Sequence, residues 1–165
     1  MTTESAGLTL IKGAVAGAAA TWLMNQVTTR IYERESDEVK TRENDARGDQ
    51  TAYASAAHEL ARISGVELSR EQEARAGTAI HWATGVMAGI KYAMFRRYWP
   101  AITAGRGVPY GLAFYLVMDE GLNPLLGLTP GPAAFPWQTH ARGAAGHVAF
   151  GAVNDGVLRA LDAVC

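Results

Sequence analysis

Ionisable side chains inside apolar segments are the feature of this sequence that could do chemistry. Asp119, Glu120 and Asn123 close one apolar segment, and His147 lies in a later segment rich in glycine and alanine. His81 lies among small residues in an earlier apolar segment. Such residues are costly in a bilayer and usually face the interior of a helix bundle, where they pair with one another or line proton and ion pathways.

The composition favours membrane-spanning helices joined by a charged loop. Only 19% of the 165 residues are charged, whereas about 25% is usual. Most of the charges lie between residues 30 and 75, and the segments on either side carry few. The net charge of −1 gives no basic field of the kind that binds nucleic acid, so we expect no nucleic-acid partner.

Four apolar segments are long enough to cross a lipid core of about 30 Å. We predict membrane spans at about 8–31, 76–97, 107–123 and 139–162. The connecting loop 32–75 is extramembrane, and its charge-dense first part must lie in water. Apolar residues at helical spacing within 51–64 predict a short amphipathic helix on the membrane surface or on the bundle. The predicted fold is therefore all-α, with 1–165 forming a single four-helix transmembrane domain and one surface helix.

Two further local patterns concern the ends of these segments. Ser69 followed by Gln72 is a capping-box pattern, which predicts the start of the helix that carries the second span. Lys12 lies near the start of the first span, where a lysine can extend outward to the membrane interface.

Small residues recur every four positions in the predicted spans, and this spacing predicts close helix packing. Residues four apart share one helix face, and small side chains there let two helices approach closely in lipid. The glycines expected to pack helices together are Gly13, Gly17, Gly85, Gly89, Gly111, Gly143 and Gly151. Besides the lipid bilayer, we expect a homo-oligomer or other membrane subunits as partners, in contact through these stripes.

Four spans that alternate in direction place most of the polar residues in one half of the bundle. The first span leaves the membrane on the side where the second enters, and the third ends on that same side. The predicted intramembrane cluster comprises Asn25, His81, Asp119, Glu120, Asn123 and His147, with Asp155 two turns deeper. His140 is too far along its helix from His147 to share one ion with it, and we expect it at the interface.

Three interpretations of this cluster stay open. The first is a structural set of hydrogen bonds between helices. The second is a proton or ion pathway, with His81 and His147 as proton-responsive groups and Asp119 or Glu120 as their partner. The third is a metal site built on His81, His147 and Asp119 or Glu120, whose residue types suit zinc.

Motifs for covalent catalysis are missing from the sequence, which has no nucleophile elbow, phosphate loop or cysteine pair. We therefore expect no enzyme activity and predict no cofactor.

The run GLTPGPAAFPWQTHARGAAGHVAFG resembles the YagU-like family of small bacterial inner-membrane proteins. The matching features are Gly127 to Pro130, Pro136 with Trp137, and Gly146 with His147, and the opening segment is similar as well. The resemblance implies a polytopic protein of the bacterial inner membrane, without a settled activity and with a suggested link to acid tolerance.

The functional prediction is accordingly an integral inner-membrane protein whose polar cluster handles protons or ions. The alternatives are an accessory or assembly subunit of a larger membrane complex and a metal-dependent membrane enzyme. A soluble bundle rich in alanine and glycine is the alternative for the fold.

Overall fold

The structure is a computed structural model that describes residues 5–48 and 50–164, and within these ranges it contains helices and no strand. The predicted all-α class is confirmed. Its long segments are α1 (Ala6–Glu33), α4 (Arg70–Tyr98), α5 (Val108–Tyr115) with its continuation, and α7 (Trp137–Val164). The continuation of α5 is a π-helical stretch, Leu116–Leu122, followed by α6 (Asn123–Leu125). The shorter elements are α2 (Asp37–Arg47), α3 (Ala52–Ile63) and the 3₁₀ segments Pro100–Gly107 and Pro132–Ala134.

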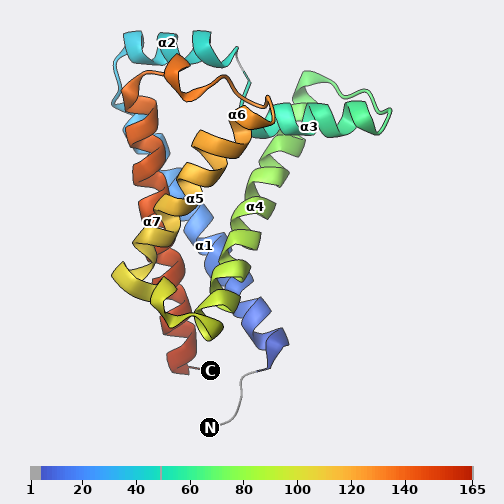
Figure 1. The fold of residues 1–165 in the computed structure, drawn as a ribbon. Helices are drawn as coiled ribbons and strands as arrows, with labels where there is room; N and C mark the ends of the chain where they lie inside the picture. The colour runs from blue at the N-terminus through green and yellow to red at the C-terminus, as the bar shows by residue number, and fades with distance from the viewer. Residues whose placement is uncertain (1–4, 49, 165) are drawn as a thin grey trace.

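The long segments alternate in direction along one bundle (Figure 1). α1 runs to the end of the bundle that carries α2, α3 and the connection between α6 and α7, which we call the loop end. α4 returns to the opposite end, where α1 begins and α7 finishes, and we call this the terminal end. α5 runs back to the loop end, and α7 returns again. α1 packs between α4 and α7, and α5 packs on α7.

Glycine makes the closest helix contacts possible. A Cβ added to Gly89 of α4 would lie 2.4 Å from the Cα of Gly17 in α1. A Cβ added to Gly111 of α5 would lie 2.0 Å from the carbonyl oxygen of His147 in α7. All seven glycines expected to pack helices meet atoms of another helical segment of the same chain in this way. Because the stripes are covered within one chain, a homo-oligomer would have to use a different surface.

The charge-dense stretch after α1 forms a helix that the sequence interpretation missed. Ser36 caps α2 by accepting a hydrogen bond from the Val39 backbone, and Gly48 ends the helix in the left-handed conformation. Acidic residues in the first turn favour the helix further. α2 lies across the loop end (Figure 1), and its Glu43 is completely buried. The expectation that this whole stretch lies in water was therefore wrong.

Other local expectations have mixed outcomes. The capping box of Ser69 and Gln72 forms at the start of α4. Lys12 does not extend outward, because its side chain is buried and its Nζ lies 3.1 Å from a carboxylate oxygen of Asp162. By length and composition, α1 is the one described helix apolar enough to cross a membrane. The prediction of four spans therefore goes beyond what hydropathy supports.

Candidate functional site

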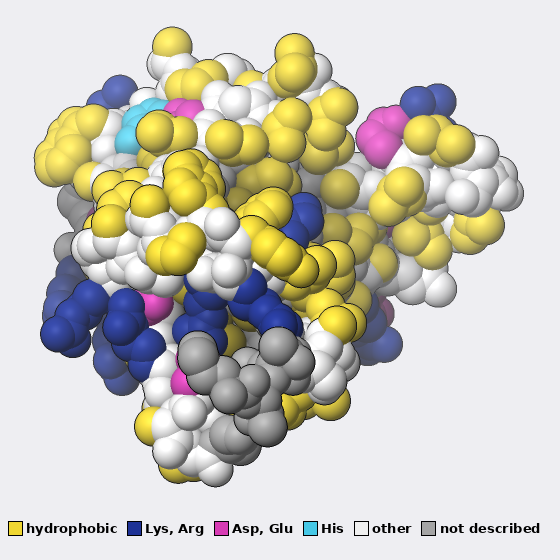
Figure 2. Space-filling view, turned by 60° about the horizontal axis from the view of Figure 1, so that its bottom comes forward, with side chains coloured by type: hydrophobic (Ala, Val, Ile, Leu, Met, Phe, Trp, Pro, Cys, Tyr) yellow, Lys and Arg dark blue, Asp and Glu magenta, His cyan; other side chains and the backbone are white. Residues whose placement is uncertain are grey.

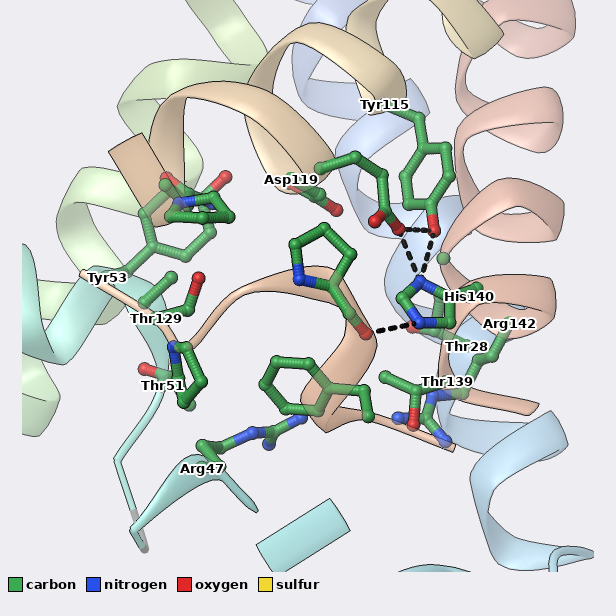
Figure 3. Close-up of a pocket in the computed structure, with 18 of the residues that line it drawn as sticks. Thr28, Arg47, Thr51, Tyr53, Tyr115, Asp119, Thr129, Thr139, His140 and Arg142 are labelled. Atoms are coloured by element: carbon green, nitrogen blue, oxygen red, sulfur yellow. Dashed lines mark hydrogen bonds and ion pairs between the residues drawn. The ribbon is translucent and has the colours of Figure 1, made fainter. Parts of the chain in front are cut away.

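A cavity of about 260 Å³ lies at the loop end, between α1, α3, the end of α5 and α6, and the start of α7 (Figure 3). The connection between α6 and α7, with its three prolines, forms one wall. Most of the surface of the cavity is apolar, although polar and ionisable side chains also line it. The residues that shape its chemistry are Tyr53, Tyr115, Asp119, Glu120, Asn123, Phe135, His140 and Arg142.

Glu120 and His140 form a close acid–base pair in this cavity. His140 Nδ1 lies 2.6 Å from Glu120 Oε1, and the hydroxyl of Tyr115 donates to the same carboxyl oxygen. The other ring nitrogen of His140, Nε2, lies 3.0 Å from the carbonyl oxygen of Pro132. The linker between α6 and α7 thus fixes the histidine ring from one side, and the end of α5 fixes it from the other (Figure 3).

These contacts determine where a proton must be. A carbonyl oxygen only accepts hydrogen bonds, so Nε2 of His140 carries a proton. If Nδ1 is bare, Glu120 must be protonated to donate to it. If Nδ1 is protonated, the imidazolium donates to the Glu120 carboxylate. In both cases one proton lies between Nδ1 and Oε1, and the pair can pass it from one atom to the other without moving the ring.

Asp119 and His147 form a second, looser pair beside the first. His147 is buried in α7, and its Nδ1 donates to the Gly143 carbonyl oxygen at 3.0 Å. Nδ1 lies 3.9 Å from Asp119 Oδ2, too far for a hydrogen bond. Because Nδ1 donates to the backbone, Nε2 is the ring nitrogen of His147 that can accept a hydrogen bond or a proton from another group.

His81 lies on the other side of His147. Its Nε2 donates to Asn25 Oδ1 at 3.0 Å, and its ring makes an edge contact with Tyr53. A small void of about 10 Å³ is lined by both His81 and His147, which is room for about one water molecule. The structure therefore places His147 between the cavity group Asp119 and the pair of Asn25 and His81.

Of the two remaining residues of the predicted cluster, Asn123 lies at the cavity and Asp155 does not. Asn123 is buried and lines the cavity. Asp155 does not join the others, because its carboxylate accepts hydrogen bonds from the Tyr92 hydroxyl at 2.8 Å and from Arg159 Nε at 2.6 Å near the terminal end. Among the described residues, no group of three His, Cys, Asp or Glu side chains lies close enough to hold a metal ion. His81, Asp119, Glu120 and His147 are thus not gathered around a common point.

Sequence interpretation missed two cavity residues, His140 and Arg142. Arg142 is buried and donates to Glu35 and Glu43 of the α1–α2 segment, and its guanidinium lies over the Tyr32 ring at 5.0 Å. This network holds α2 onto α7 beside the cavity. A buried arginine requires acidic partners, and the acid-rich stretch 33–45 was the signal that could have indicated them.

Tyr53 and the pair of His58 and Glu73 lie where α3 crosses α4. Burial, and secondarily the charge of Asp119, raises the pKa of the Tyr53 hydroxyl above its ordinary value, so it stays protonated at the cavity. His58 Nδ1 lies 2.6 Å from Glu73 Oε1. This hydrogen bond is the main reason why the pKa of the Glu73 carboxyl is lowered. The spacing matches that of Glu120 and His140, but this pair lies outside the cavity.

Comparison with known proteins gives one family. A family model described as a protein of unknown function (DUF1440) matches residues 57–156. No curated protein and no solved structure matches the chain. The matched segment contains both partners of the Glu120–His140 and Asp119–His147 pairs, whereas α1 and α2 lie outside it.

Proposed function

The chain belongs to the DUF1440 family, and we propose that it is a four-helix protein of the bacterial inner membrane that takes up and releases protons at its loop-end cavity. Glu120 and His140 are the groups proposed to hold the exchanged proton. His147 and Asp119 would pass it inward toward His81. The resemblance to YagU-like proteins, with their suggested link to acid tolerance, agrees with this role.

The distribution of side chains supports the membrane location. In a soluble protein, polar groups face water and large apolar groups are buried, but here many residues follow the opposite pattern. Outward-facing large apolar residues on the four long segments include Ile11, Trp22, Met87, Phe95, Leu116, Val117 and Trp137. Buried polar residues of the same segments include Thr9, Thr21, Asn123, His147, Asn154 and Asp155. Lipid around the bundle would cover the outward-facing apolar residues, and the buried polar residues would form hydrogen bonds between helices.

α3 supports the same location. Its Ala54 and Ala57 are buried, and its backbone crosses α4 so closely that a Cβ on Gly77 would lie 2.7 Å from the Ala54 nitrogen. The helix projects sideways from the loop end (Figure 1), with Leu60 and Ile63 exposed. An amphipathic helix held across the end of a bundle in this way fits the interface between lipid and water.

The contact between His140 Nε2 and the Pro132 carbonyl is the observation that carries the proton-exchange proposal. It forces the proton of the 2.6 Å contact with Glu120 to be shared between the two partners. A histidine and a carboxylate that share one proton act as one acid–base group, which can pass this proton on and accept another. The cavity gives this pair access to water, and its apolar walls limit exchange elsewhere.

Proton flux in proteoliposomes tests the proposal. Wild-type protein is reconstituted with a pH-sensitive dye inside the vesicles, and an acid pulse is applied outside. Glu120→Gln removes the ionisable partner of His140 and keeps a similar shape, so we expect the flux to fall by about tenfold or more, in the range of a lost acid–base group. Glu73→Gln is the matched control, because it breaks a His–Glu contact of equal length outside the cavity.

Two results would contradict the proposal. One is wild-type flux no greater than that of empty vesicles. The other is an equal loss in the Glu73→Gln and Glu120→Gln variants, which would show that both changes act through folding. Nitrogen-15 NMR of His140 adds a direct measurement, because Nε2 should carry a proton at every pH at which the protein is folded.

A further inference from the structure

Asp119 is an ionisable residue of the loop-end cavity whose carboxylate has no hydrogen-bond donor. No residue within the described ranges 5–48 and 50–164 donates to it. His147 Nδ1 lies 3.9 Å away, but it donates to the Gly143 carbonyl oxygen instead. The side chain of Asp119 lines the cavity and is 34% exposed, so a molecule in the cavity can reach it. A carboxylate in a mostly apolar cavity is costly unless a cation or a donor pairs with it.

The other ionisable groups that line the cavity are balanced without Asp119. Two arginines line it, and both donate to buried glutamates of the α1–α2 segment. Arg142 donates to Glu35 and Glu43, and Arg47 donates to Glu43. The histidine–glutamate pair described above shares one proton and is neutral in either arrangement. The carboxylate of Asp119 therefore gives the cavity an excess of one negative charge.

Basic side chains lie away from this carboxylate. Figure 3 shows Asp119 in the upper part of the cavity and Arg47 at its lower edge. Other Lys and Arg side chains, dark blue in Figure 2, gather at the terminal end, which is the end of the bundle opposite the cavity. A cation beside Asp119 would therefore meet no positive side chain of the chain itself.

Three aromatic rings line the same cavity, and they come from three different segments. Tyr53 lies on α3, Tyr115 ends α5, and Phe135 lies in the linker before α7. The faces of aromatic rings attract cations, and the rings also cover apolar groups. A carboxylate without a partner and several aromatic rings in one cavity are the features that recognise an organic ammonium ion.

The size of the cavity limits the ligand. Its volume is about 260 Å³. A cavity of about 150 Å³ accommodates benzene, whereas pockets for drug-sized ligands measure about 300–1,000 Å³. The cavity therefore has room for an amine whose apolar part is about as large as one ring.

We propose that the loop-end cavity binds a small organic ammonium ion, namely a protonated amine with one ring or a short alkyl chain. The charged nitrogen donates to Asp119, and the apolar part lies against Tyr53, Tyr115 and Phe135. This assignment goes beyond the proposed function, because binding needs an open cavity and an ionised Asp119 but neither proton exchange nor flux across a bilayer.

Calorimetric titration of the purified full-length chain in detergent tests this assignment. Benzylammonium and benzyl alcohol carry the same ring, but the alcohol has a neutral hydroxyl in place of the ammonium group. At neutral pH we expect benzylammonium to saturate one site per chain and to bind about tenfold or more tightly than benzyl alcohol, since a hydrogen bond to a charged group contributes about that factor. Titration into the same detergent without protein corrects for partitioning into micelles.

Two variants separate the role of Asp119 from that of the overall charge. Asp119→Asn keeps the shape and removes the charge, and the fold should survive because no described residue donates to this carboxylate. In this variant the affinity for benzylammonium should fall by about tenfold, and the affinity for benzyl alcohol should stay the same. Glu71→Gln is the matched control, because it removes one negative charge from an exposed glutamate that pairs with Arg75 near the start of α4. It should leave the affinity for benzylammonium unchanged.

Three results would overturn the proposal. The first is equal affinity of the wild-type protein for the two probes, a comparison that does not depend on the folding of any variant. The second is an unchanged affinity for benzylammonium in a folded Asp119→Asn variant. The third is displacement of benzylammonium by an equal concentration of ammonium chloride, which would identify a site for inorganic cations. A protein that binds benzylammonium through Asp119 but shows no proton flux would support this assignment and contradict the proposed function.

Discussion

The contact between α1 and α4 gives a prediction with a definite sign. Gly89→Ala would place a methyl group 2.4 Å from the Cα of Gly17 and 2.6 Å from the Gly13 carbonyl oxygen. Both are backbone atoms, so no side chain can rotate to make room and the two helices must separate. Gly156→Ala is the matched control, because it adds the same methyl group to α7 where nothing lies within 4 Å.

The expected changes in the free energy of unfolding differ between these variants. Both variants gain the higher helix propensity of alanine, but only Gly89→Ala suffers a steric clash. Replacing glycine by alanine inside a helix stabilises it by about 1 kcal/mol. Inserting a methyl group into a closed contact costs about 1–3 kcal/mol, and a clash between backbones belongs at the upper end of that range. Gly89→Ala should therefore destabilise the protein by about 2 kcal/mol, whereas Gly156→Ala should stabilise it by about 1 kcal/mol.

Thermal unfolding in mild detergent measures this difference. At about 2–4 °C per kcal/mol for a chain of this size, Gly89→Ala should lower the Tm by about 4–8 °C and Gly156→Ala should raise it by about 2–4 °C. Equal shifts in the two variants would refute the packing argument. A Gly89→Ala variant as stable as the wild type would show that α1 and α4 are not in backbone contact.

Three further predictions follow from other contacts. Arg142→Met should destabilise the protein by about 3 kcal/mol, because it leaves the buried Glu43 with less compensation, and adding Glu43→Leu should recover part of this in denaturant unfolding. His58→Ala should raise the pKa of Glu73, whose lowered value comes mainly from that hydrogen bond. The pKa of Glu73 is lower in the folded protein than in the unfolded chain. The wild-type pair therefore stabilises the protein at a pH above the unfolded pKa of Glu73, and this stabilisation is lost as the pH falls through the folded pKa. Carboxyl NMR titration measures the shift, and the variant should lose less stability on acidification. Reporters fused to the two ends of the chain should lie on one side of the membrane, because α1 begins and α7 finishes at the terminal end, and opposite sides would contradict four spans.

Periodicity in the sequence was enough to predict the long helical segments and the faces on which small residues lie, but it did not predict α2. Residues four apart share a helix face whatever the rest of the fold does, so Gly13 with Gly17 and Gly85 with Gly89 could be assigned to common faces. Periodicity does not identify the partner of a face. The same stripes suggested association between chains, but in the structure they pack α1 on α4 within one chain.

The parts of the site that depend on loops could not be predicted in the same way. His140 meets Glu120 only because the linker after α6 brings the start of α7 beside the end of α5 and places the Pro132 carbonyl against the ring. Arg142 is buried only because α2 folds over the loop end. Lys12 was expected at the membrane surface, but Asp162, 150 residues later in the sequence, lies beside it. Each of these contacts joins segments whose relative position no local pattern specifies.

The apolar core between the two ends of the bundle limits the transfer of a proton from the loop-end cavity to the terminal end. Below His147, the buried cluster of Ala20, Ala88 and Phe150 separates the histidines from the Tyr92–Asp155 hydrogen bond. A proton cannot cross such an apolar layer without water or a polar side chain to carry it. Asn154 is completely buried in this region, and neither polar atom of its amide has a hydrogen-bond partner among the described residues. A buried amide of this kind is costly unless water reaches it. The flux across the bilayer that the proteoliposome assay measures therefore requires two things, proton exchange at Glu120 and His140 and water that enters the bundle at the level of Asn154.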